Sequence, residues 1–600
     1  MDRGRSAVAS AAMSGFRERA AREMERHNPG ETVTPIMRKL MADSAAMLAR
    51  GPGDSAARAA AARTFAIAHL DDLHEELRRQ FRRRGIGYHR AATPEVAVAT
   101  TRRLLKGARK VAKSKTMVGE EVGLTHALRE GGIEVLETDI GEYIVDIEGR
   151  GPSHLTAPAL HLNRARIHEL LARGGGADLP DDDPERLSRH VRDIVRDFFT
   201  SCDAGITGAN TTIASSGRIL IVENEGNVAL GASHPDLHIA ITGLEKVVAD
   251  EAGALALLEV LAPNATAQPL TSFSHFFAGP EKGQERHVVF VDNGRSAIAK
   301  DARYRDVLKC IRCGACMNAC PVYRTAGGLS YGTPYMGPIG AVISPLLWDD
   351  GRYADLPEAS SLCGRCTEVC PVGIPLHRLL LELRAEGVEN GELGSMVERM
   401  GWGAWAAAFG GTRRAKLATA LGRFGIERFG RFFEGFRPEG DPRAAPVISV
   451  ERDPAMLEGG GRREEGGGPA RGPVEPESEK APMDLVELFR ERAGALGVEV
   501  VERIRKAQGD RVVKATAGIA NTGSVLLTGR EAARRPLLAA GRIVVELQAK
   551  TIVRHPSGLE GYLGDGDALI LTGASRTADI EKQIVRGIHG AERMVVVLKR

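Results

Sequence analysis

The sequence predicts a multidomain protein in which two α/β domains flank a helical, cysteine-rich domain. Three observations support this fold class. Seven of the eight cysteines lie between residues 310 and 370. Short runs rich in Val and Ile alternate with helical segments before that region, and part of the same pattern returns near the C-terminus. A chain of 600 residues is long enough for three or four domains.

The first 110 residues are expected to form a helical region that leads into the first α/β domain. Ala and Leu alternate with Arg and Glu at helical spacing, and Leu70, Leu73 and Leu77 form one apolar stripe. The basic run at residues 82–84 is expected to lie on a solvated helix face.

Residues 111–295 are predicted to form an α/β domain with a largely parallel sheet. Runs bounded by Gly, Pro or Asn have the composition of buried strands. Because helical segments separate these runs, a parallel arrangement is favoured. The predicted strands are residues 133–138, 155–160, 218–222, 237–241 and 287–291.

The cysteine-rich region begins with the spacing C-x2-C-x2-C-x3-C-P at Cys310 and continues with C-x2-C-x3-C-P at Cys363. Structural zinc usually takes two CxxC or CxxH pairs and does not require this run. Disulfides suit small secreted chains. Iron–sulfur ligation fits best, because three thiolates spaced by two residues can surround one cluster while the cysteine before proline turns toward a second.

Crossed ligation of this kind assigns the cysteines to two clusters. The first cluster is predicted to be held by Cys310, Cys313, Cys316 and Cys370. The second is predicted to be held by Cys320, Cys363 and Cys366. This second set is one thiolate short, and Ser360 stands where its first cysteine would be. The second cluster is therefore either [3Fe–4S], or [4Fe–4S] with Ser360, water or a substrate on its last iron.

The cluster domain is expected to span residues 296–390 and to be mainly helical. Pro375 precedes a run in which Leu376, Leu379, Leu380 and Leu383 share one helix face. A helical tail is expected at residues 391–440. Residues 441–482 include a tract rich in Gly, Pro and charge that cannot bury a core, so a flexible linker is predicted there.

Residues 483–600 are predicted to form a second α/β domain that is related to the first and shortened at its front. A similar pattern at similar spacing over some eighty residues is hard to obtain by chance. The matching segments are residues 518–528 with 212–222, Ile543 and Lys550 with Ile239 and Lys246, and residues 594–598 with 287–291.

Glu225 is the first candidate outside the cysteines for a polar catalytic or binding role. It lies with Asn210 and Asn227 in Gly-rich loops, where backbone can approach a small anion closely. Turn chemistry alone can also explain these residues. Lys113 and Lys115 precede a predicted helix start, which suits an anion, although the acidic residues that follow also suit the helix dipole.

Arg576 is the second candidate. It is expected in a loop that enters a helix, with Ser575 or Thr577 as the cap and Asp579 and Glu581 in the first turn. An anionic substrate or cofactor could meet the helix there. Two further residues are expected to be structural: His589 as a packed histidine and Cys202 as a small buried residue.

The composition excludes several classes of function. Lys and Arg nearly balance Asp and Glu, with a net charge of +3, so no nucleic-acid partner is expected. No apolar run reaches the length of a membrane span, and the N-terminus lacks the apolar core of a signal peptide, so a cytoplasmic location is expected. The short segment around Trp402 and Trp405 allows at most a weak membrane-surface contact.

No nicotinamide, flavin or P-loop motif is evident. The chain is therefore expected to pass electrons, while the first oxidation step takes place at a site shared with a partner or on a further cofactor.

The segments CPVYR, YGTPYMGPIGAVISPLL and ASSLCGRCTEVCPVGIPL resemble the lactate-utilisation iron–sulfur family, the B component of the bacterial L-lactate oxidation complex. KSKTMVGEEVGL and ENEGNV resemble the N-terminal domain of that family. The C-terminal TGASRTADIEKQIVRGIHGAERMVVVL is similar to the C component, so the chain resembles a natural fusion. One departure is residues 214–217, Ala-Ser-Ser-Gly, where the family often has Ala-Glu-Thr-Gly.

This resemblance implies NagB/ribose-isomerase/CoA-transferase-like LUD domains and two iron–sulfur clusters. It also implies electron transfer during oxidation of L-lactate to pyruvate. The expected partners are a cysteine-rich A-component-like subunit and an electron acceptor such as a membrane quinone. Three alternatives stay open: another 2-hydroxy acid such as glycolate, an acyl-CoA or sugar-phosphate enzyme with structural or sensing clusters, and a scaffold whose last domain docks partners.

Overall fold

The computed structural model describes residues 15–175, 179–391, 393, 396–409, 484–508, 510–574, 576–580 and 584–599. Two compact units are present, Met1–Glu392 with Met483–Arg600, and Leu393–Pro482. In the second unit the described element is α20 (Met396–Phe409), on which Trp405 is exposed. The side chain of Trp402 and the predicted linker lie outside the described residues. Among the described helices, none is long and apolar enough to cross a membrane.

From residue 15 onward, the described part of the first unit starts with four helices: α2 (Phe16–His27), α3 (Pro29–Leu48), α4 (Ser55–Ala68) and α5 (Leu70–Arg84). In α5 the predicted stripe faces the core, with Leu70 and Leu77 buried and Leu73 half-buried. The basic run is only partly solvated, because the Arg84 guanidinium donates to the carbonyls of Ser216 and Ala278. The region also contains a strand, β1 (Ile86–Ala91), where only helix was expected.

Six parallel strands form the sheet of the first α/β domain, in the order β1-β10-β7-β4-β2-β3. The chain moves outward from β2 to β3, returns to β4 beside β2, and then moves the other way to β7 and β10. The sheet therefore has a topological switch point between β2 and β4. The strands after β1 are β2 (Lys110–Lys113), β3 (Glu134–Glu137), β4 (Ala204–Thr207), β7 (Leu237–Gly243) and β10 (Glu285–Val291).

Two strand predictions need correction. Residues 155–160 form turns, not a strand, and they are buried because they pack against the cysteine domain. The Tyr323 hydroxyl donates to the carbonyl of Ser153 in this contact. The predicted strand at residues 218–222 exists as β6 (Arg218–Glu223), but it is antiparallel and belongs to a second sheet.

The second sheet joins the two α/β domains. Its eight strands follow the order β16-β13-β14-β17-β9-β6-β5-β8, so its two halves mirror each other about the β17–β9 pair. In that antiparallel pair His275 lies opposite Leu569. The first half contains β5 (Thr211–Ile213), β6, β8 (Val247–Val248) and β9 (Phe273–Phe277). The second half contains β13 (Ala517–Ile519), β14 (Ser524–Thr528), β16 (Ile552–Val553) and β17 (Ala568–Leu571).

The C-terminal domain also has a parallel sheet, in the order β11-β20-β15-β12, which matches β1-β10-β7-β4. The register agrees with the sequence repeat, because Ile543 pairs with Met594 as Ile239 pairs with His287. Within the described residues this sheet has no counterpart of β2 and β3, so the domain is a shortened α/β domain. Its strands are β11 (Glu499–Val501), β12 (Asp510–Lys514), β15 (Arg542–Gln548) and β20 (Arg593–Lys599).

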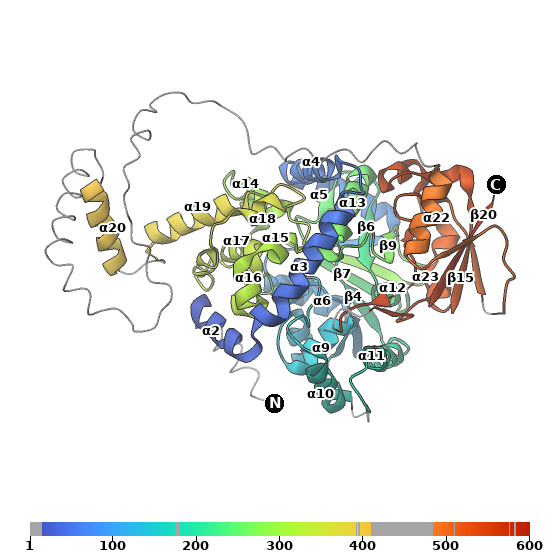
Figure 1. Ribbon diagram of the computed structural model, residues 1–600, viewed down its shortest axis with the longest axis horizontal. Helices are drawn as coiled ribbons and strands as arrows, with labels where there is room; N and C mark the ends of the chain where they lie inside the picture. The colour runs from blue at the N-terminus through green and yellow to red at the C-terminus, as the bar shows by residue number, and fades with distance from the viewer. Residues whose placement is uncertain are drawn as a thin grey trace, which may run out of the picture. The chain divides into compact units, whose positions relative to one another are not determined.

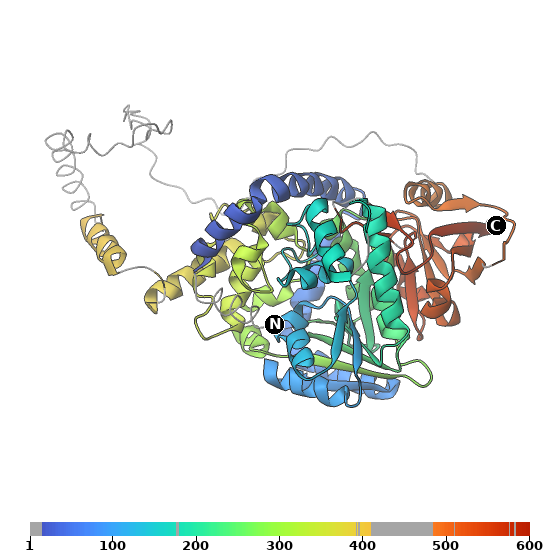
Figure 2. The same cartoon turned by 90° about the horizontal axis from the view of Figure 1, so that it is seen from below.

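The cysteine domain is helical. The predicted face of its last helix is buried through Leu376, Leu379, Leu380 and Leu383. Helix α3 packs on α15 and α16 of this domain and on α13 of the first α/β domain, as Figures 1 and 2 show. Its elements are α14 (Arg295–Lys300), η1 (Arg305–Lys309), α15 (Ala315–Ala319), α16 (Pro321–Ala326), η2 (Gly328–Tyr331), α17 (Gly337–Leu347), η3 (Leu356–Glu358), α18 (Arg365–Glu368) and α19 (Leu376–Glu389).

The remaining elements cover the sheets. Those of the first α/β domain are α6 (Pro94–Leu104), α7 (Met117–Glu121), α8 (Leu124–Glu130), α9 (Ile140–Glu148), α10 (Arg164–Gly175), α11 (Pro184–Phe199), α12 (Asn227–Ser233) and α13 (Glu251–Thr266). Those of the C-terminal domain are α22 (Leu485–Ala495), η6 (Gly529–Ala532), α23 (Arg534–Leu538), η7 (Ala549–Thr551), η8 (Pro556–Tyr562), β18 (Arg576–Thr577) and β19 (Val585–Arg586).

Candidate functional site

Four cysteines lie together at the start of the cysteine domain. Cys310 follows η1, Cys316 lies on α15 and Cys370 follows α18. Burial raises the pKa of the Cys316 thiol, and the nearby Cys310, Cys313 and Cys370 raise it further. The four cysteines also pack in one apolar cluster of the cysteine domain, so their thiols are neighbours.

The other three cysteines of the region form a second group. Burial and the nearby Cys320 and Cys363 together raise the pKa of Cys366 to about 11. Helices α15 and α18 contact each other, so the two groups are neighbours. The structure thus brings the seven cysteines together in two groups; their binding of iron stays a prediction.

The surroundings of the thiols suit iron–sulfur clusters. Soft thiolates are the ligands that such clusters use, and amide donors to the sulfur atoms stabilise their negative charge. The Arg312 amide donates to Cys310 Sγ at 3.4 Å and the Ile374 amide to Cys370 Sγ at 3.4 Å. Cys320 Sγ caps α16 by accepting from an amide at 3.5 Å. The residues present therefore fit two clusters.

A cavity of about 1160 Å³ lies at the carboxyl ends of the parallel strands of the first α/β domain. The loops after β2 and β4 line it, and the edge where these two strands meet is the switch point at which open α/β sheets bind ligands. Helix α3, residues 154–157 and the end of α13 also line the cavity. The cysteine domain contributes residues 311, 312 and 335, and the C-terminal domain contributes residues 576–579.

One end of the cavity is basic and touches the first cysteine group. Lys246 is 6% exposed, and its ammonium donates to the carbonyl of Cys310 at 2.8 Å. The Arg312 guanidinium lies 4.3 Å above the ring of Tyr335, and its Nη1 is buried without a hydrogen-bond partner among the described residues. Burial and the neighbouring Arg312 lower the pKa of Lys246 to about 7.

A buried ion network supports this basic end. Arg295 is fully buried and binds Glu121 and Glu245, each at 2.6 Å. The Tyr335 hydroxyl donates to Glu121, which ties the cysteine domain to the α/β domain. Burial alone would raise the pKa of Glu245, but Arg295, Lys246 and Arg312 outweigh it and lower this pKa to about 2.

The opposite part of the cavity wall is acidic. Asp139, Glu225 and Asp579 each offer a carboxylate oxygen within 4.8 Å of the others. Burial and the charge of Asp579 raise the pKa of Asp139 to about 6, and burial with Asp139 and Asp579 raises the pKa of Glu225 well above its usual value. Asp139 and Glu225 therefore hold their protons more tightly than exposed carboxyl groups do.

Arg576 lies beside this acidic group, but not in the predicted loop and helix. Residues 576–577 form the strand β18, which pairs with β19, and the Arg576 amide donates to the carbonyl of Asn224 at 2.9 Å. This contact with the first α/β domain replaces the expected helix start. Nε and Nη2 of Arg576 are buried without a partner in the described part of the chain. Ser575 and Glu581 lie outside the described residues.

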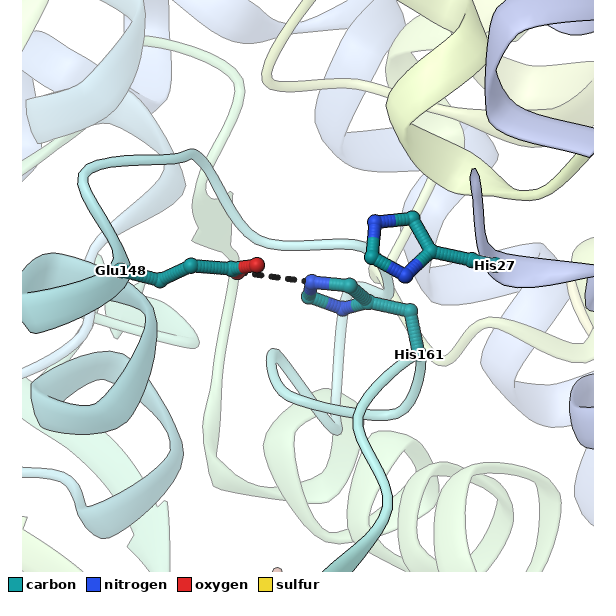
Figure 3. Close-up of side chains that lie close together, drawn as sticks. All are labelled: His27, Glu148 and His161. Atoms are coloured by element: carbon teal, nitrogen blue, oxygen red, sulfur yellow. Dashed lines mark hydrogen bonds and ion pairs between the residues drawn. The ribbon is translucent and has the colours of Figure 1, made fainter. Parts of the chain in front are cut away.

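A second cluster of possible metal ligands lies elsewhere in the first unit, formed by His27, Glu148 and His161 (Figure 3). His161 Nε2 is 2.9 Å from Glu148, and the His27 ring stands edge-on to the His161 ring. Arg150 donates to His27 Nε2 at 2.8 Å and brings a positive charge to the cluster. An ion pair with packed rings explains this group better than a bound cation.

Comparison with known proteins gives the family. Residues 74–293 match the LUD domain, and residues 306–374 match the 4Fe-4S dicluster domain. Lactate utilization protein B of Exiguobacterium sp. is 44% identical over 346 residues, which cover 56% of this chain and 73% of that protein. The chain belongs to the lactate utilization protein B family.

The uncharacterized electron transport protein YkgF of Escherichia coli is another relative of this chain. It is 42% identical over 345 residues, covering 56% of this chain and 72% of its own. A solved DUF162 family protein from Deinococcus radiodurans covers 37% of this chain and 98% of its own, with 16% identity and a TM-score of 0.21. A likeness at that level supports no argument about the fold.

For this member of the lactate utilization protein B family, the structure places both non-cysteine candidates on the cavity wall. Glu225 and Arg576 line the cavity, as do Asn210 and Asn227. Their catalytic or binding role stays a prediction. Sequence reasoning missed the basic end, although Lys246 was noted as the repeat partner of Lys550.

Several other candidates have structural environments. Lys113 is fully buried and binds Glu137 at 2.8 Å, so it is not available to an external anion. His589 is fully buried, and burial lowers its pKa to about 3, as expected for a packed histidine. Cys202 is half-buried, and burial raises its pKa to about 11.

Proposed function

We propose that this protein is the iron–sulfur electron-transfer component of a complex that oxidises L-lactate to pyruvate. The observation that carries the proposal is the contact between the cavity and the first cysteine group. Lys246 touches the carbonyl of Cys310, and Ile311 and Arg312 form part of the cavity wall. A ligand in the cavity would therefore lie against the cluster-binding segment, with no protein layer between them.

The basic end of the cavity suits the carboxylate of a 2-hydroxy acid. Arg312 has a buried Nη1 without a partner among the described residues, and Lys246 uses only one of its three donors in a hydrogen bond of the described structure. Carboxylate recognition by such a pair is strong in a site that excludes water. Oxidation of the bound acid to the 2-oxo acid removes two electrons and two protons.

The proposed cluster ligands are those of the two cysteine groups. Cys310, Cys313, Cys316 and Cys370 would hold the first cluster, and Cys320, Cys363 and Cys366 the second. When bound, such clusters supply one-electron transfer. The first group borders the cavity, whereas Cys363 of the second group is exposed. The two groups thus connect the cavity with the surface, where a cysteine-rich partner subunit or a quinone would collect the electrons.

Reduction by substrate tests the proposal. Full-length Lys246→Met, purified anaerobically with its partners, should keep its iron and sulfide but need at least about tenfold more L-lactate for reduction, a loss of about 1.4 kcal/mol or more. Lys550→Met is the matched control, because Lys550 is the exposed repeat counterpart of Lys246. L-lactate, D-lactate and glycolate are compared. Wild-type protein without sulfide, or reduction that is equal in both variants, would contradict the proposal.

A second candidate follows from the size of the cavity. About 1160 Å³ is more than a three-carbon acid fills, and it suits a larger anion such as an acyl-CoA or sugar phosphate. In that case the clusters would be structural or sensing elements. Ligand binding that survives Cys310→Ser, measured by calorimetry with the folded variant, would favour this second function over electron transfer.

A further inference from the structure

The segment that begins at Ser360 repeats the backbone of the segment that begins at Cys310. Two residues after each starting residue the chain enters the left-handed region, with φ of 62° at Arg312 and 56° at Leu362. A residue with a side chain adopts this conformation at a cost of about 1 kcal/mol or more. In the described parts of the chain, five residues other than glycine have a positive φ: Asn28, Ala267, Asn293, Arg312 and Leu362.

The two segments also agree beyond that point. Gly314 has φ 79° and ψ −5°, and Gly364 has φ 79° and ψ −14°. Each glycine is followed at once by a short helix, α15 or α18, whose second residue is Cys316 or Cys366. The second segment therefore has the conformation of a complete three-ligand loop, although its first residue is a serine.

The first side chain occupies the same place in both segments. Cys310 Sγ accepts a hydrogen bond from the amide of Arg312 at 3.4 Å. Ser360 Oγ accepts from the amide of Leu362 at 3.1 Å. In both cases the donor is the amide two residues along the chain, so the serine oxygen points where the cysteine sulfur points in the other loop.

A helix fixes the backbone at this serine. Arg384 on α19 donates from Nη2 to the carbonyl of Ser360 at 2.6 Å and from Nε to the carbonyl of Pro357 at 2.8 Å. The guanidinium thus holds both ends of the turn that leads into the loop. A position held in this way is preorganised for a ligand, because little conformational freedom is lost on binding.

We infer that Ser360 Oγ is the fourth protein ligand of the second cluster, which completes a four-iron centre with Cys320, Cys363 and Cys366. This inference rests on the iron–sulfur assignment of the proposed function. Binding replaces the hydroxyl proton by iron and releases that proton to solvent. An alkoxide oxygen is a harder donor than a thiolate and favours the oxidised iron, so it lowers the reduction potential of the cluster relative to a cysteine ligand.

Water is the competing ligand. A cavity of about 240 Å³ borders Ser360 and Ser361, together with residues of α2 and η3, and a small molecule could reach the position through it. Removal of the serine oxygen distinguishes between the two possible ligands. A water ligand would stay in place, whereas a serine ligand would be lost.

The test uses full-length protein after anaerobic reconstitution, with iron and sulfide counted per chain and EPR spectra taken in the oxidised state. Wild type should contain two four-iron clusters and show no three-iron signal. Ser360→Ala should lose one iron per chain and show the signal of an oxidised three-iron cluster. Ser360→Cys should keep all the iron and raise the reduction potential of the second cluster. The control is Ser361→Ala, because Ser361 is the exposed neighbour.

Two outcomes would overturn the inference. One is Ser360→Ala with the iron content, EPR spectrum and potential of wild type, which would mean that water is the ligand. The other is a three-iron signal from fully reconstituted wild type. Both outcomes leave the electron-transfer proposal standing, because that proposal fails on other results: wild type without sulfide, or equal reduction of Lys246→Met and Lys550→Met by L-lactate.

Discussion

His275 and Leu569 lie directly opposite each other where the two halves of the eight-stranded sheet meet. The antiparallel register continues on either side of this pair, where Ser274 pairs with Ile570 and Phe276 with Ala568, and the strand order of one half mirrors that of the other. The two strands that pair, β9 and β17, hold equivalent positions in the two halves of the sheet. The fused domains therefore associate as a pseudo-dimer of related units, and the C-terminal domain brings its residues 576–579 to the cavity of the first domain.

Arg534→Met should weaken this association. Arg534 is 1% exposed and donates to Asp567 of its own domain and to His275 Nδ1 of the first domain. Its loss leaves the Asp567 carboxylate with the Ala278 amide but without its charged donor, at a cost of about 2 kcal/mol. Faster hydrogen exchange in β9 and β17 is the expected result. Arg530→Met, at an exposed position nearby, should leave the exchange rates unchanged.

The sequence predicted two related domains but not their pairing. The repeat was visible because buried strands of both domains keep the same Val and Ile pattern, whereas the edge through which they pair has no sequence signal of its own. The error at residues 155–160 has a similar origin. An apolar run looks the same whether a strand or a turn packed against another domain buries it, as Leu155 and Leu160 do here.

The cysteine groups could likewise be predicted from the sequence, whereas the basic end of the cavity could not. Cysteine spacing is a local signal, so both groups were predicted from the chain alone. The basic end of the cavity depends on contacts between Lys246 and Arg312 that only folding creates. Arg576 was named from the sequence as a candidate and lines the cavity, but its strand and its contact with Asn224 depend on the docking of two domains.

Arg576→Ala should weaken ligand binding without loss of the clusters. Its guanidinium lines the cavity and has buried nitrogens that make no hydrogen bond within the described residues. Removal of this charge should raise the KM for the 2-hydroxy acid about tenfold, or about 1.4 kcal/mol, with iron content unchanged. Arg576→Lys should restore part of the affinity. Arg593→Ala, on an exposed position of β20, serves as the control, and an equal KM in both alanine variants would argue against a ligand contact.

Asp139→Asn should stabilise the protein above pH 6. The pKa of Asp139 is raised to about 6 in the folded protein, from 3.8, so the folded state holds the proton more tightly than the unfolded state. Stability is therefore lost as pH rises from about 4 to 6 and stays low above that. Asparagine keeps the cap of α9 and removes the charge, so the gain should be about 1–2 kcal/mol at pH 7.5 and small near pH 4.

Thermal unfolding at pH 4.5 and 7.5 measures this difference. Asp183→Asn is the matched control, because Asp183 caps α11 in the same way but is exposed. An equal shift of the unfolding temperature for both variants at both pH values would show that the buried charge of Asp139 contributes nothing.

Arg295→Met should be the most destabilising of these changes. Arg295 is fully buried between Glu121 and Glu245, and its removal leaves two buried carboxylates without their main partner. Breaking a buried pair in this way costs about 3–5 kcal/mol. Because the Tyr335 hydroxyl donates to the same Glu121, the effect should reach the contact between the α/β and cysteine domains.

Tyr335→Phe separates these two contributions. It removes the two hydrogen bonds of the Tyr335 hydroxyl, which donates to Glu121 and accepts from Arg295 Nη2, and leaves the ion pairs in place, so it should cost only about 2 kcal/mol. Limited proteolysis of the cysteine domain, followed over time, should accelerate strongly in Arg295→Met and slightly in Tyr335→Phe. Arg303→Met provides the control, since Arg303 is largely exposed and its ion pairs lie at the surface. Proteolysis of Arg295→Met at the rate of this control would mean that the buried network does not hold the two domains together.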